Sequence, residues 1–334
     1  MTKKILILPG DGVGPTVISS AVRVLEQAAE KKIDILYGDV GQSAFVKTSE
    51  YLPSETLDLA TEVDAIITGG AIDVGADKHY RNPIRALKKQ LNLYSVVRKF
   101  SPLCSNLGVP GVNMLVITGN PDTLLNAVEI ESLDGVNYQK FLSITSCRKL
   151  FQKTLKIATL MERKKITCAH RISMFPALDG MFVEYFFKEF AGSRFLLEEM
   201  EADEAAAEIT RNPSSMDVVV STDVYGHVLA GVVAGMVGGS YLTPVGNLGD
   251  SIGLFEPMHG PNPKLVKKGF VNPTSAILSS AMAFDHLGMP ARAEKIRKAV
   301  KDVYREGKTT PDVGGKATTD EFTDSVVEAL RKNM

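Results

Sequence analysis

The sequence of 334 residues has no tryptophan, only three cysteines and almost no net charge. Cys104, Cys147 and Cys168 lack the spacing of a disulfide framework or a zinc site, so we expect free, buried thiols in a reducing compartment. The formal net charge of −1 gives no electrostatic reason to expect a nucleic acid or an anionic membrane as a partner. No apolar run reaches the roughly 20 residues that a membrane-spanning helix needs. We therefore expect a soluble protein.

The remaining composition, with 44% hydrophobic and 23% charged residues, is that of an ordinary globular protein. The chain is long enough for one large or two medium domains with a substantial core. Its first residues lead directly into an expected strand, so no targeting peptide is expected, although a removed presequence would leave no trace. We expect the mitochondrial matrix as the location in a eukaryote and the cytoplasm otherwise.

Short apolar runs alternate with segments of helical periodicity, a pattern that predicts an α/β protein with a largely parallel sheet. The expected strands are residues 4–8, 33–36, 65–68, 114–118, 165–169 and 217–221. The expected helices are residues 15–30, 55–61, 149–158, 180–190, 202–209 and 273–287. The glycine-rich segment 9–15 lacks the last glycine of a dinucleotide fingerprint, so we interpret it as a tight strand-to-helix turn.

Several sequence blocks follow one another along nearly the whole chain. They are Leu8-Pro-Gly-Asp-Gly-Val-Gly-Pro15, Leu87-Lys-Lys-Gln-Leu-Asn-Leu-Tyr94, Val128-Glu-Ile-Glu-Ser132, Asp179-Gly180, Tyr225-Gly226, Phe255-Glu-Pro-Met-His-Gly260, Val271-Asn-Pro-Thr-Ser-Ala-Ile-Leu-Ser279 and Thr310-Pro-Asp-Val-Gly-Gly315. In this order they resemble the isocitrate and isopropylmalate dehydrogenase family. The blocks 128–132 and 310–315 are most similar to subunits of NAD-type isocitrate dehydrogenase.

The resemblance implies a non-Rossmann, isopropylmalate-dehydrogenase-like fold with a central, mostly parallel or mixed sheet. We expect a large, nucleotide-side domain of residues 1–100 plus 250–334 and a small, dimerisation domain of residues 101–249. It also implies an obligate dimer that completes each active site across the interface. Family members oxidise a 2-hydroxy acid with NAD or NADP and a divalent metal ion, and then release its β-carboxylate as carbon dioxide.

The metal-binding positions of the family are altered in this chain. His227 and Gly231 stand where the family has the two aspartates of Tyr-Gly-Asp-x-x-x-Asp, and Asp203 keeps a third ligand position. Glycine offers no ligand, and imidazole matches Mg²⁺ poorly. Asp223 replaces a family asparagine, and we favour the interpretation that it does not restore the site. The resemblance therefore argues against a bound Mg²⁺ or Mn²⁺.

The proton-transfer positions are altered as well. Arg171 replaces the family's lysine base, and a guanidinium is effectively never deprotonated. Leu125 falls on the position of the family's tyrosine acid and has no proton to give. Neither catalytic position is intact.

The positively charged residues at the substrate positions are better preserved. Arg98 matches one family arginine, and Lys88 replaces a second without the bidentate guanidinium. Thr118 replaces a third. Together with Arg171, Arg98 and Lys88 are our candidates for binding an anionic substrate or effector.

The nucleotide positions of the family also persist. Glu256, His259, Gly260 and Asn272 match it, and the resemblance implies that Asn272 contacts adenine. Lys264 stands where NAD-using members have aspartate and NADP-using members have lysine. It either meets a 2′-phosphate or is a solvated loop lysine, and the sequence leaves both open.

Three interpretations follow. The favoured one is a non-catalytic or regulatory subunit, either a homodimer or a heteromer with a catalytic paralogue, that binds a small anionic metabolite or a nucleotide. The second is an active NAD(P)-dependent oxidative decarboxylase with a rebuilt site in which His227 serves as base or ligand. The third is a purely structural protein that has lost ligand binding.

Overall fold

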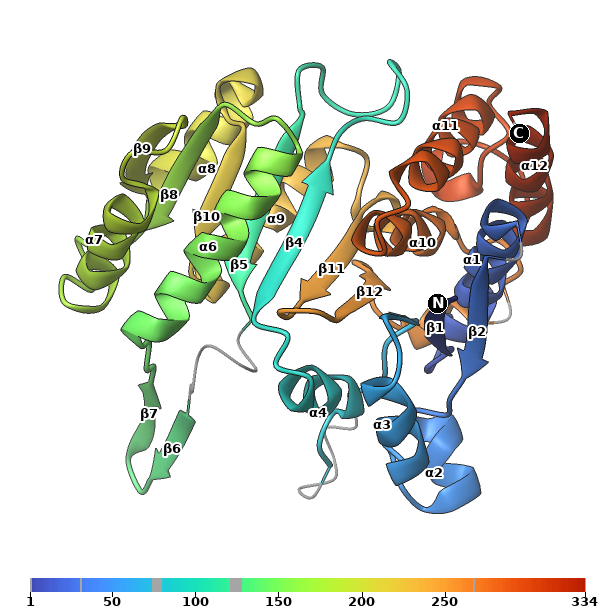
Figure 1. The fold of residues 1–334 in the computed structure, drawn as a ribbon, viewed down its shortest axis with the longest axis horizontal. Coiled ribbons are helices and arrows are strands. Elements are labelled where there is room, and N and C mark those ends of the chain that lie inside the picture. The colour runs from blue at the N-terminus through green and yellow to red at the C-terminus, as the bar shows by residue number, and fades with distance from the viewer. Residues whose placement is uncertain (1, 31, 74–79, 121–127, 267, 334) are drawn as a thin grey trace.

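The computed structural model describes residues 2–333 except 31, 74–79, 121–127 and 267. Within these residues, ten strands form one sheet in the order β2-β1-β3-β12-β11-β4-β5-β10-β8-β9 (Figure 1). The strands are β1 (Lys3–Leu8), β2 (Ile33–Tyr37), β3 (Ala65–Thr68), β4 (Ser95–Phe100), β5 (Met114–Gly119), β8 (Lys165–His170), β9 (Leu196–Glu201), β10 (Val218–Ser221), β11 (Pro244–Leu248) and β12 (Gly253–Pro257). The predicted α/β class is confirmed.

The sheet is parallel at both ends and antiparallel in the middle. Strands β2, β1, β3 and β12 run parallel, and so do β5, β10, β8 and β9. Between them, β11 is antiparallel to both β12 and β4, and β4 is antiparallel to β5. The inner parallel strands β3 and β10 are short, almost wholly apolar runs because helices cover both of their faces, whereas the edge strands β2 and β9 are partly exposed and carry charged residues.

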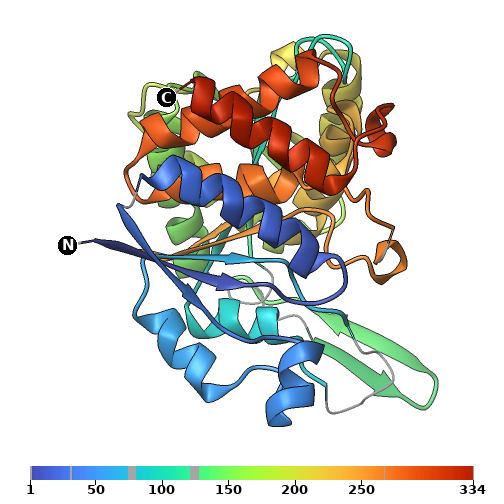
Figure 2. The ribbon, with the colours of Figure 1, turned by 90° about the vertical axis from the view of Figure 1, so that its right-hand side faces the viewer.

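Helices cover the two faces of the sheet in two groups. The first face packs against α1 (Gly14–Ala29), α6 (Ile144–Leu160), α7 (Leu178–Phe190), α10 (Thr274–His286), α11 (Pro290–Arg305) and α12 (Thr319–Lys332). The second face packs against α2 (Gln42–Thr48), α3 (Ser54–Thr61), α4 (Pro83–Gln90), α8 (Ala202–Arg211) and α9 (Asp223–Met236). Figure 2 shows α1 and α12 above the sheet and α2, α3 and α4 below it.

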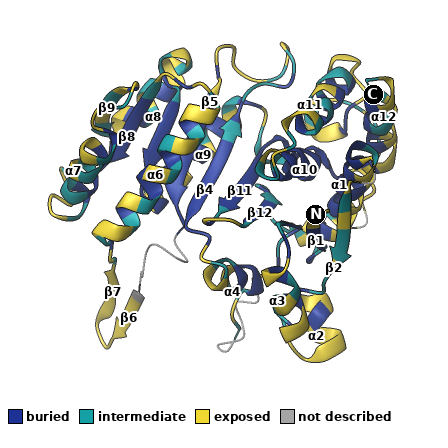
Figure 3. Cartoon of the chain, viewed as in Figure 1, coloured by how far each residue is buried: buried dark blue, intermediate teal, exposed yellow. Residues whose placement is uncertain are grey.

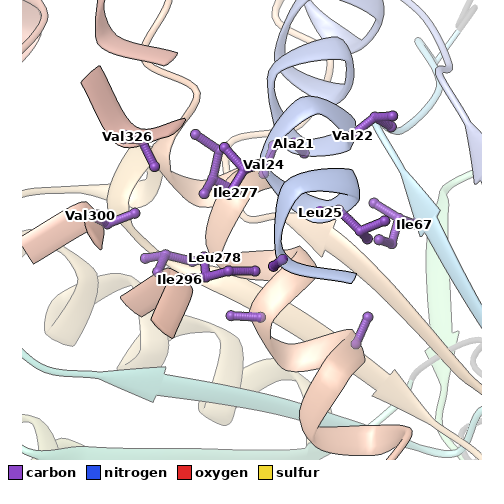
Figure 4. Close-up of a cluster of buried hydrophobic side chains, with 14 of the residues drawn as sticks. Ala21, Val22, Val24, Leu25, Ile67, Ile277, Leu278, Ile296, Val300 and Val326 are labelled. Carbon is purple, nitrogen blue, oxygen red and sulfur yellow. The ribbon is translucent and has the colours of Figure 1, made fainter. Parts of the chain in front are cut away.

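The largest apolar cluster lies between the first face and its helices. Leu25 of α1 points towards Ile67 of β3, while Ile277, Ile296 and Val326 come from α10, α11 and α12 (Figure 4). Along each of these helices the buried apolar residues recur every three to four positions, as Val17, Ala21, Val24 and Ala28 do in α1, so that one stripe of the helix is buried. The strands of the sheet are buried along most of their length, whereas the outer sides of the helices are exposed (Figure 3).

The second face carries a polar strip between its two apolar clusters. Arg98 of β4 pairs with Val245 of β11, which in turn pairs with Glu256 of β12. Residues in register point to the same side of a sheet, so Arg98 and Glu256 share this face. By the same register, Asn247 and Thr118 lie on it one pleat further along. These four residues form what we call the polar floor, with α4 on one side and α9 on the other.

A hairpin of β6 (Val128–Ser132) and β7 (Gly135–Gln139) projects from the body of the molecule (Figure 1). Every residue of β7 is exposed.

The three cysteines are free, with Cys147 and Cys168 buried and Cys104 only partly so. In the described ranges, no helix combines the length and apolarity that crossing a bilayer requires.

Candidate functional site

Helix α4 brings Lys88 to the polar floor. The side chain of Asn82 accepts hydrogen bonds from the backbone N–H groups of Ile84 and Arg85, and this cap starts the helix that carries Lys88 in its last turn. Lys88 Nζ lies 2.6 Å from Glu256 Oε1, and Asn247 Nδ2 donates to the same oxygen at 2.8 Å. The charge of Lys88 is therefore already neutralised by a carboxylate.

Arg98 is buried without such a partner. The residue is only 4% exposed, and its Nε and Nη1 groups have no hydrogen-bond acceptor among the residues that the structure describes. Burial lowers the pKa of Arg98 to about 10, although the charge of Glu256 acts in the opposite direction. Thr118 Oγ1, on the same face, is also buried and unpartnered. Because buried donors without acceptors are costly, the floor presents a ready site for an anion.

His227 lies on α9 and faces the charges of the floor. The ring Nδ1 donates to the carbonyl oxygen of Asp223 at 2.7 Å, which leaves Nε2 as the unprotonated nitrogen of the neutral ring. Although His227 is exposed at the surface of the single chain, desolvation and then the charge of Arg98 lower its pKa. A neutral imidazole at this position can accept a proton or a hydrogen bond.

Asp223, the first residue of α9, is paired with a residue that the sequence did not single out. Its Oδ1 lies 3.2 Å from Lys140 Nζ, and both side chains are largely buried. Lys140 Nζ also lies 5.6 Å from the centre of the Tyr225 ring. Asp223 thus forms an ion pair with a cation of the same chain, although its Oδ1 makes no hydrogen bond among the described residues.

The two glycines of α9 differ in their surroundings. A Cβ atom on Gly226 would lie 2.1 Å from Thr118 Cγ2, so only glycine allows α9 to pack this closely on β5. A Cβ atom on Gly231 would meet nothing within 4 Å, and the residue is exposed. Packing therefore does not explain why Gly231 stands at a metal-ligand position of the family.

Arg171 and Asp203 form a separate pair. Arg171 Nη1 lies 2.5 Å from Asp203 Oδ1, and its Nε lies 3.4 Å from Glu201 Oε2. The hydrogen bond from Arg171 lowers the pKa of Asp203. Both residues line a surface groove of about 480 Å³ together with Met174, Phe175, Ala202, Ala206, Tyr225, Val228 and Leu229.

Within a single chain, the described side chains do not assemble a site for a Mg²⁺ or Mn²⁺ ion. Within the described part of the chain, no three His, Cys, Asp or Glu side chains come together as a possible metal site. Asp203 is bonded to Arg171 and Asp223 to Lys140, while His227 offers a single nitrogen. Hard divalent ions prefer several oxygen ligands, which this arrangement does not supply.

His259 marks the candidate nucleotide turn. Its ring stacks on Tyr241, with centroids 4.0 Å apart and planes at 10°, and its Nδ1 donates to the carbonyl of Gly260 at 2.6 Å. Asn262 Nδ2 donates to the Tyr241 hydroxyl at 2.7 Å. His259 Nε2 is buried and has no partner in the described residues, and burial lowers the pKa of His259 to about 4. Gly260 has φ +65°, a conformation that favours glycine.

Asn272 is buried, and its side-chain amide is committed to the protein itself. Nδ2 donates to Tyr304 Oη at 3.1 Å and to Asp312 Oδ2 at 3.0 Å, while Oδ1 accepts from the backbone N–H of Thr274 at 3.0 Å. Both donor positions of the Asn272 amide are thus used, and its Oδ1 keeps one acceptor site besides the backbone for the adenine contact that the resemblance implies. Lys264 is exposed on the short 3₁₀ turn Pro263–Leu265, so its two interpretations both stay open.

The structure groups the predicted site residues into three sets. Lys88, Arg98 and Glu256 lie at the polar floor, beside the helix α9 that carries His227. Arg171 and Asp203 lie in the groove. His259, Gly260 and Lys264 share the nucleotide turn. Leu125 lies outside the described residues. Lys140, Tyr241 and Asn247 were not predicted, because no spacing in the sequence ties them to their distant partners.

Comparison with known proteins agrees with this fold over the whole chain. A family model described as isocitrate/isopropylmalate dehydrogenase matches residues 4–326. The isocitrate/homoisocitrate dehydrogenase of Thermus thermophilus is 34% identical over 99% of this chain and 99% of its own length. A probable NAD isocitrate dehydrogenase subunit alpha, mitochondrial, of Drosophila melanogaster is 32% identical over 98% of this chain and 88% of its own.

A solved structure supports the same assignment. The crystal structure of isocitrate dehydrogenase from Methylococcus capsulatus superimposes with a TM-score of 0.90 at 27% identity, covering 98% of this chain and 99% of that one. The predicted isopropylmalate-dehydrogenase-like fold is thereby confirmed. The chain belongs to the isocitrate/isopropylmalate dehydrogenase family.

Proposed function

We propose that this chain is a non-catalytic, regulatory-type member of the family that binds a small carboxylate anion at the polar floor. The observation that carries the proposal is the buried guanidinium of Arg98, whose Nε and Nη1 have no acceptor among the described residues. A carboxylate would accept from these donors and neutralise the charge. A tricarboxylate metabolite such as isocitrate or citrate is the ligand class that the family relationship suggests.

The lost reaction chemistry supports a role without turnover. Arg171 stands at the position of the family's base, where its guanidinium forms ion pairs with Asp203 and Glu201 and keeps its proton. In the single chain, Asp203 and Asp223 are each ion-paired with a basic side chain, which argues against their binding the metal ion that would stabilise the enolate in the family's reaction.

One observation favours the alternative, an active NAD(P)-dependent decarboxylase with a rebuilt site. His227 holds its Nδ1 proton on the Asp223 carbonyl, so its Nε2 is a proton acceptor beside the charge of Arg98. In that case His227 would take the hydroxyl proton. Turnover of isocitrate or isopropylmalate with NAD or NADP, lost in His227→Ala, would decide for this alternative.

We further propose that the nucleotide turn binds NAD, NADP or a related nucleotide as an effector. The Nε2 of His259 is buried and makes no hydrogen bond with the described residues, so it can accept one from an amino or hydroxyl group of the nucleotide. Family resemblance at Gly260 and Asn272 points in the same direction.

We also propose that the groove between α8 and α9 is a subunit interface, either with a second copy or with a catalytic paralogue. Its apolar lining includes Val228 and Met174, which are 63% and 61% exposed in the single chain. Burying such a patch is favourable. Light scattering should show a dimer that Val228→Asp disrupts, whereas Val46→Asp, at an exposed valine of α2, leaves it intact. A monomeric parent chain would contradict this.

The central experiment is calorimetric titration with isocitrate and citrate. Binding to the parent chain should weaken by about 10- to 100-fold in Arg98→Met, because hydrogen bonds to a charged group contribute about 1.5–3 kcal/mol. Arg331→Met, which removes an exposed arginine of α12, is the matched control and should bind normally. If neither tricarboxylate binds the parent chain, or if Arg98→Met binds as tightly, the proposal is wrong.

A further inference from the structure

Two carboxylates near the lost metal positions each form an ion pair with a basic side chain of the same chain. Asp203 is paired with Arg171 at 2.5 Å and Asp223 with Lys140 at 3.2 Å. Neither cation was singled out for this role from the sequence. The two pairs differ in burial, since the Asp203 side chain is 68% exposed whereas that of Asp223 is 7% exposed.

The buried pair is the one that bears on the polar floor. Lys140, at the end of the β6–β7 hairpin, is 13% exposed in its side chain and places its ammonium group against both Asp223 and the Tyr225 ring. Its charge also reaches Asp179, a buried carboxylate that accepts a hydrogen bond from the backbone N–H of Arg171 at 2.7 Å. Lys140 is therefore a fixed cation among buried acidic groups.

The charge of Asp223 reaches the anion site through a shared neighbour. On α9, the carbonyl oxygen of Asp223 accepts from His227 Nδ1 at 2.7 Å, and Gly226, which lies between them, packs directly on Thr118 of the polar floor. Burial, and then the charges of Arg98, Asp223 and Lys88, act on the pKa of His227. Without Lys140, the buried carboxylate of Asp223 would be unpaired and would repel an anion that approaches Arg98. Removing one member of a buried ion pair leaves a charge that the protein must compensate in another way.

We propose that Lys140 supplies from within the chain the positive charge that a divalent ion would supply beside Asp223, so that the polar floor binds its carboxylate ligand without metal. This inference rests on the proposed anion-binding function. Of the cations on or near the floor, Lys88 is hydrogen-bonded to Glu256, and Lys140 is ion-paired with Asp223. Arg98 is then the group that receives a carboxylate of the ligand.

The first test measures metal dependence directly. The affinity of the parent chain for isocitrate should be the same in excess EDTA and in excess MnCl₂. Electron paramagnetic resonance of Mn²⁺ should show no protein-bound ion, with or without isocitrate. If isocitrate binds only with Mn²⁺, this inference is wrong while the proposed anion site stands. If isocitrate binds under neither condition, the proposed function itself fails.

The second test separates the charge of Lys140 from its shape. In EDTA, Lys140→Gln should weaken isocitrate binding by about tenfold, equivalent to about 1.4 kcal/mol, because Asp223 is then unpaired. Adding Asp223→Asn to this variant should restore the parent affinity, and Lys140→Arg should keep it. The matched control is Lys149→Gln. Lys149 lies on α6, and its Nζ is likewise 5.6 Å from the centre of a tyrosine ring, that of Tyr94.

Two results would overturn the role of Lys140. One is parent-like binding by the Lys140→Gln variant, and the other is failure of the double variant to recover affinity. If Lys140→Gln does not fold, the double variant and Lys140→Arg carry the test, since both leave no unpaired buried charge. Each must then bind isocitrate in EDTA as the parent does, and weaker binding by either contradicts the inference.

Discussion

Lys88 Nζ lies 2.6 Å from Glu256 Oε1, so the carboxylate whose charge reaches Arg98 is already bonded to another cation. Arg98 is left as a buried guanidinium with unused donors. Such an arrangement costs stability in the ligand-free chain, because desolvation of the charge is not repaid. It is typical of a site that is built to receive a ligand rather than to hold the fold together.

Replacing Arg98 by methionine should therefore stabilise the free chain while removing ligand binding. We expect a gain of about 1–4 kcal/mol in the free energy of unfolding, measured by urea denaturation. Arg163 is the contrasting control, since this buried arginine donates to the carbonyl of Asn113 at 2.8 Å and to Asp217 at 2.9 Å. Arg163→Met should cost about 3–5 kcal/mol. Equal losses in both variants would mean that Arg98 is structural.

The two glycines of α9 should respond oppositely to alanine. Gly226→Ala places a methyl group against Thr118 and should destabilise the chain by about 1–3 kcal/mol through overpacking. Gly231→Ala meets nothing and should gain about 0.5–1 kcal/mol from helix propensity. Thermal unfolding of both variants measures the difference. A neutral Gly226→Ala would show that α9 can move away from β5.

Acid should destabilise the fold partly through His259. Burial lowers the pKa of His259 to about 4, whereas a histidine of the unfolded chain titrates near 6.5. The folded state therefore holds fewer protons in this window, so stability is full above pH of about 6.5 and falls as the pH drops towards about 4. The loss amounts to at most about 3 kcal/mol. The free energy of unfolding of His259→Gln should lack this part of the pH dependence; an identical slope would contradict it.

Tyr241 should restrict access to the nucleotide turn. Its ring covers one face of His259, and Asn262 holds its hydroxyl in place. If a nucleotide base uses that face, Tyr241→Ala should bind NADPH several-fold more tightly, and Tyr241→Phe should show a smaller gain. Because the chain has no tryptophan, nucleotide fluorescence can be followed without that background. Weaker binding by Tyr241→Ala would make the ring part of the binding surface instead.

The sequence predicted the buried strands that form uninterrupted apolar runs, but it missed the equally buried β4, β11 and β12, whose apolar runs are broken by Arg98, Asn247 and Glu256. Strand β10 is an uninterrupted apolar run between covering helices, and α10 is almost wholly buried. The edge strand β9 was missed, since its Leu-Leu-Glu-Glu-Met-Glu sequence is acidic and half-exposed. The β6–β7 hairpin was missed for a similar reason, as neither side of β7 is covered. The periodic Phe322, Val326 and Leu330 of α12 could have been recognised from spacing alone.

For the site, the sequence predicted identities but not partners. Arg98, Lys88 and His227 were located from the family blocks: Lys88 contacts Glu256, Arg98 shares a sheet face with Glu256, and His227 lies on α9, the helix beside the polar floor. The pairing of Lys140 with Asp223 depends on how the hairpin returns to α9, and that of Tyr241 with His259 on how two loops pack. Such contacts between distant segments leave no periodic trace. The division into two domains stays a prediction.

The position of β12 has a consequence for synthesis of the chain on the ribosome. Ala65 of β3 pairs with Gly253 of β12, so one edge of β3 stays open until most of the polypeptide has emerged. An apolar strand with unpaired backbone groups is a template for wrong association. Non-local pairing of this kind also slows folding. Newly made molecules should therefore depend on chaperones until the last third of the chain arrives to close the sheet.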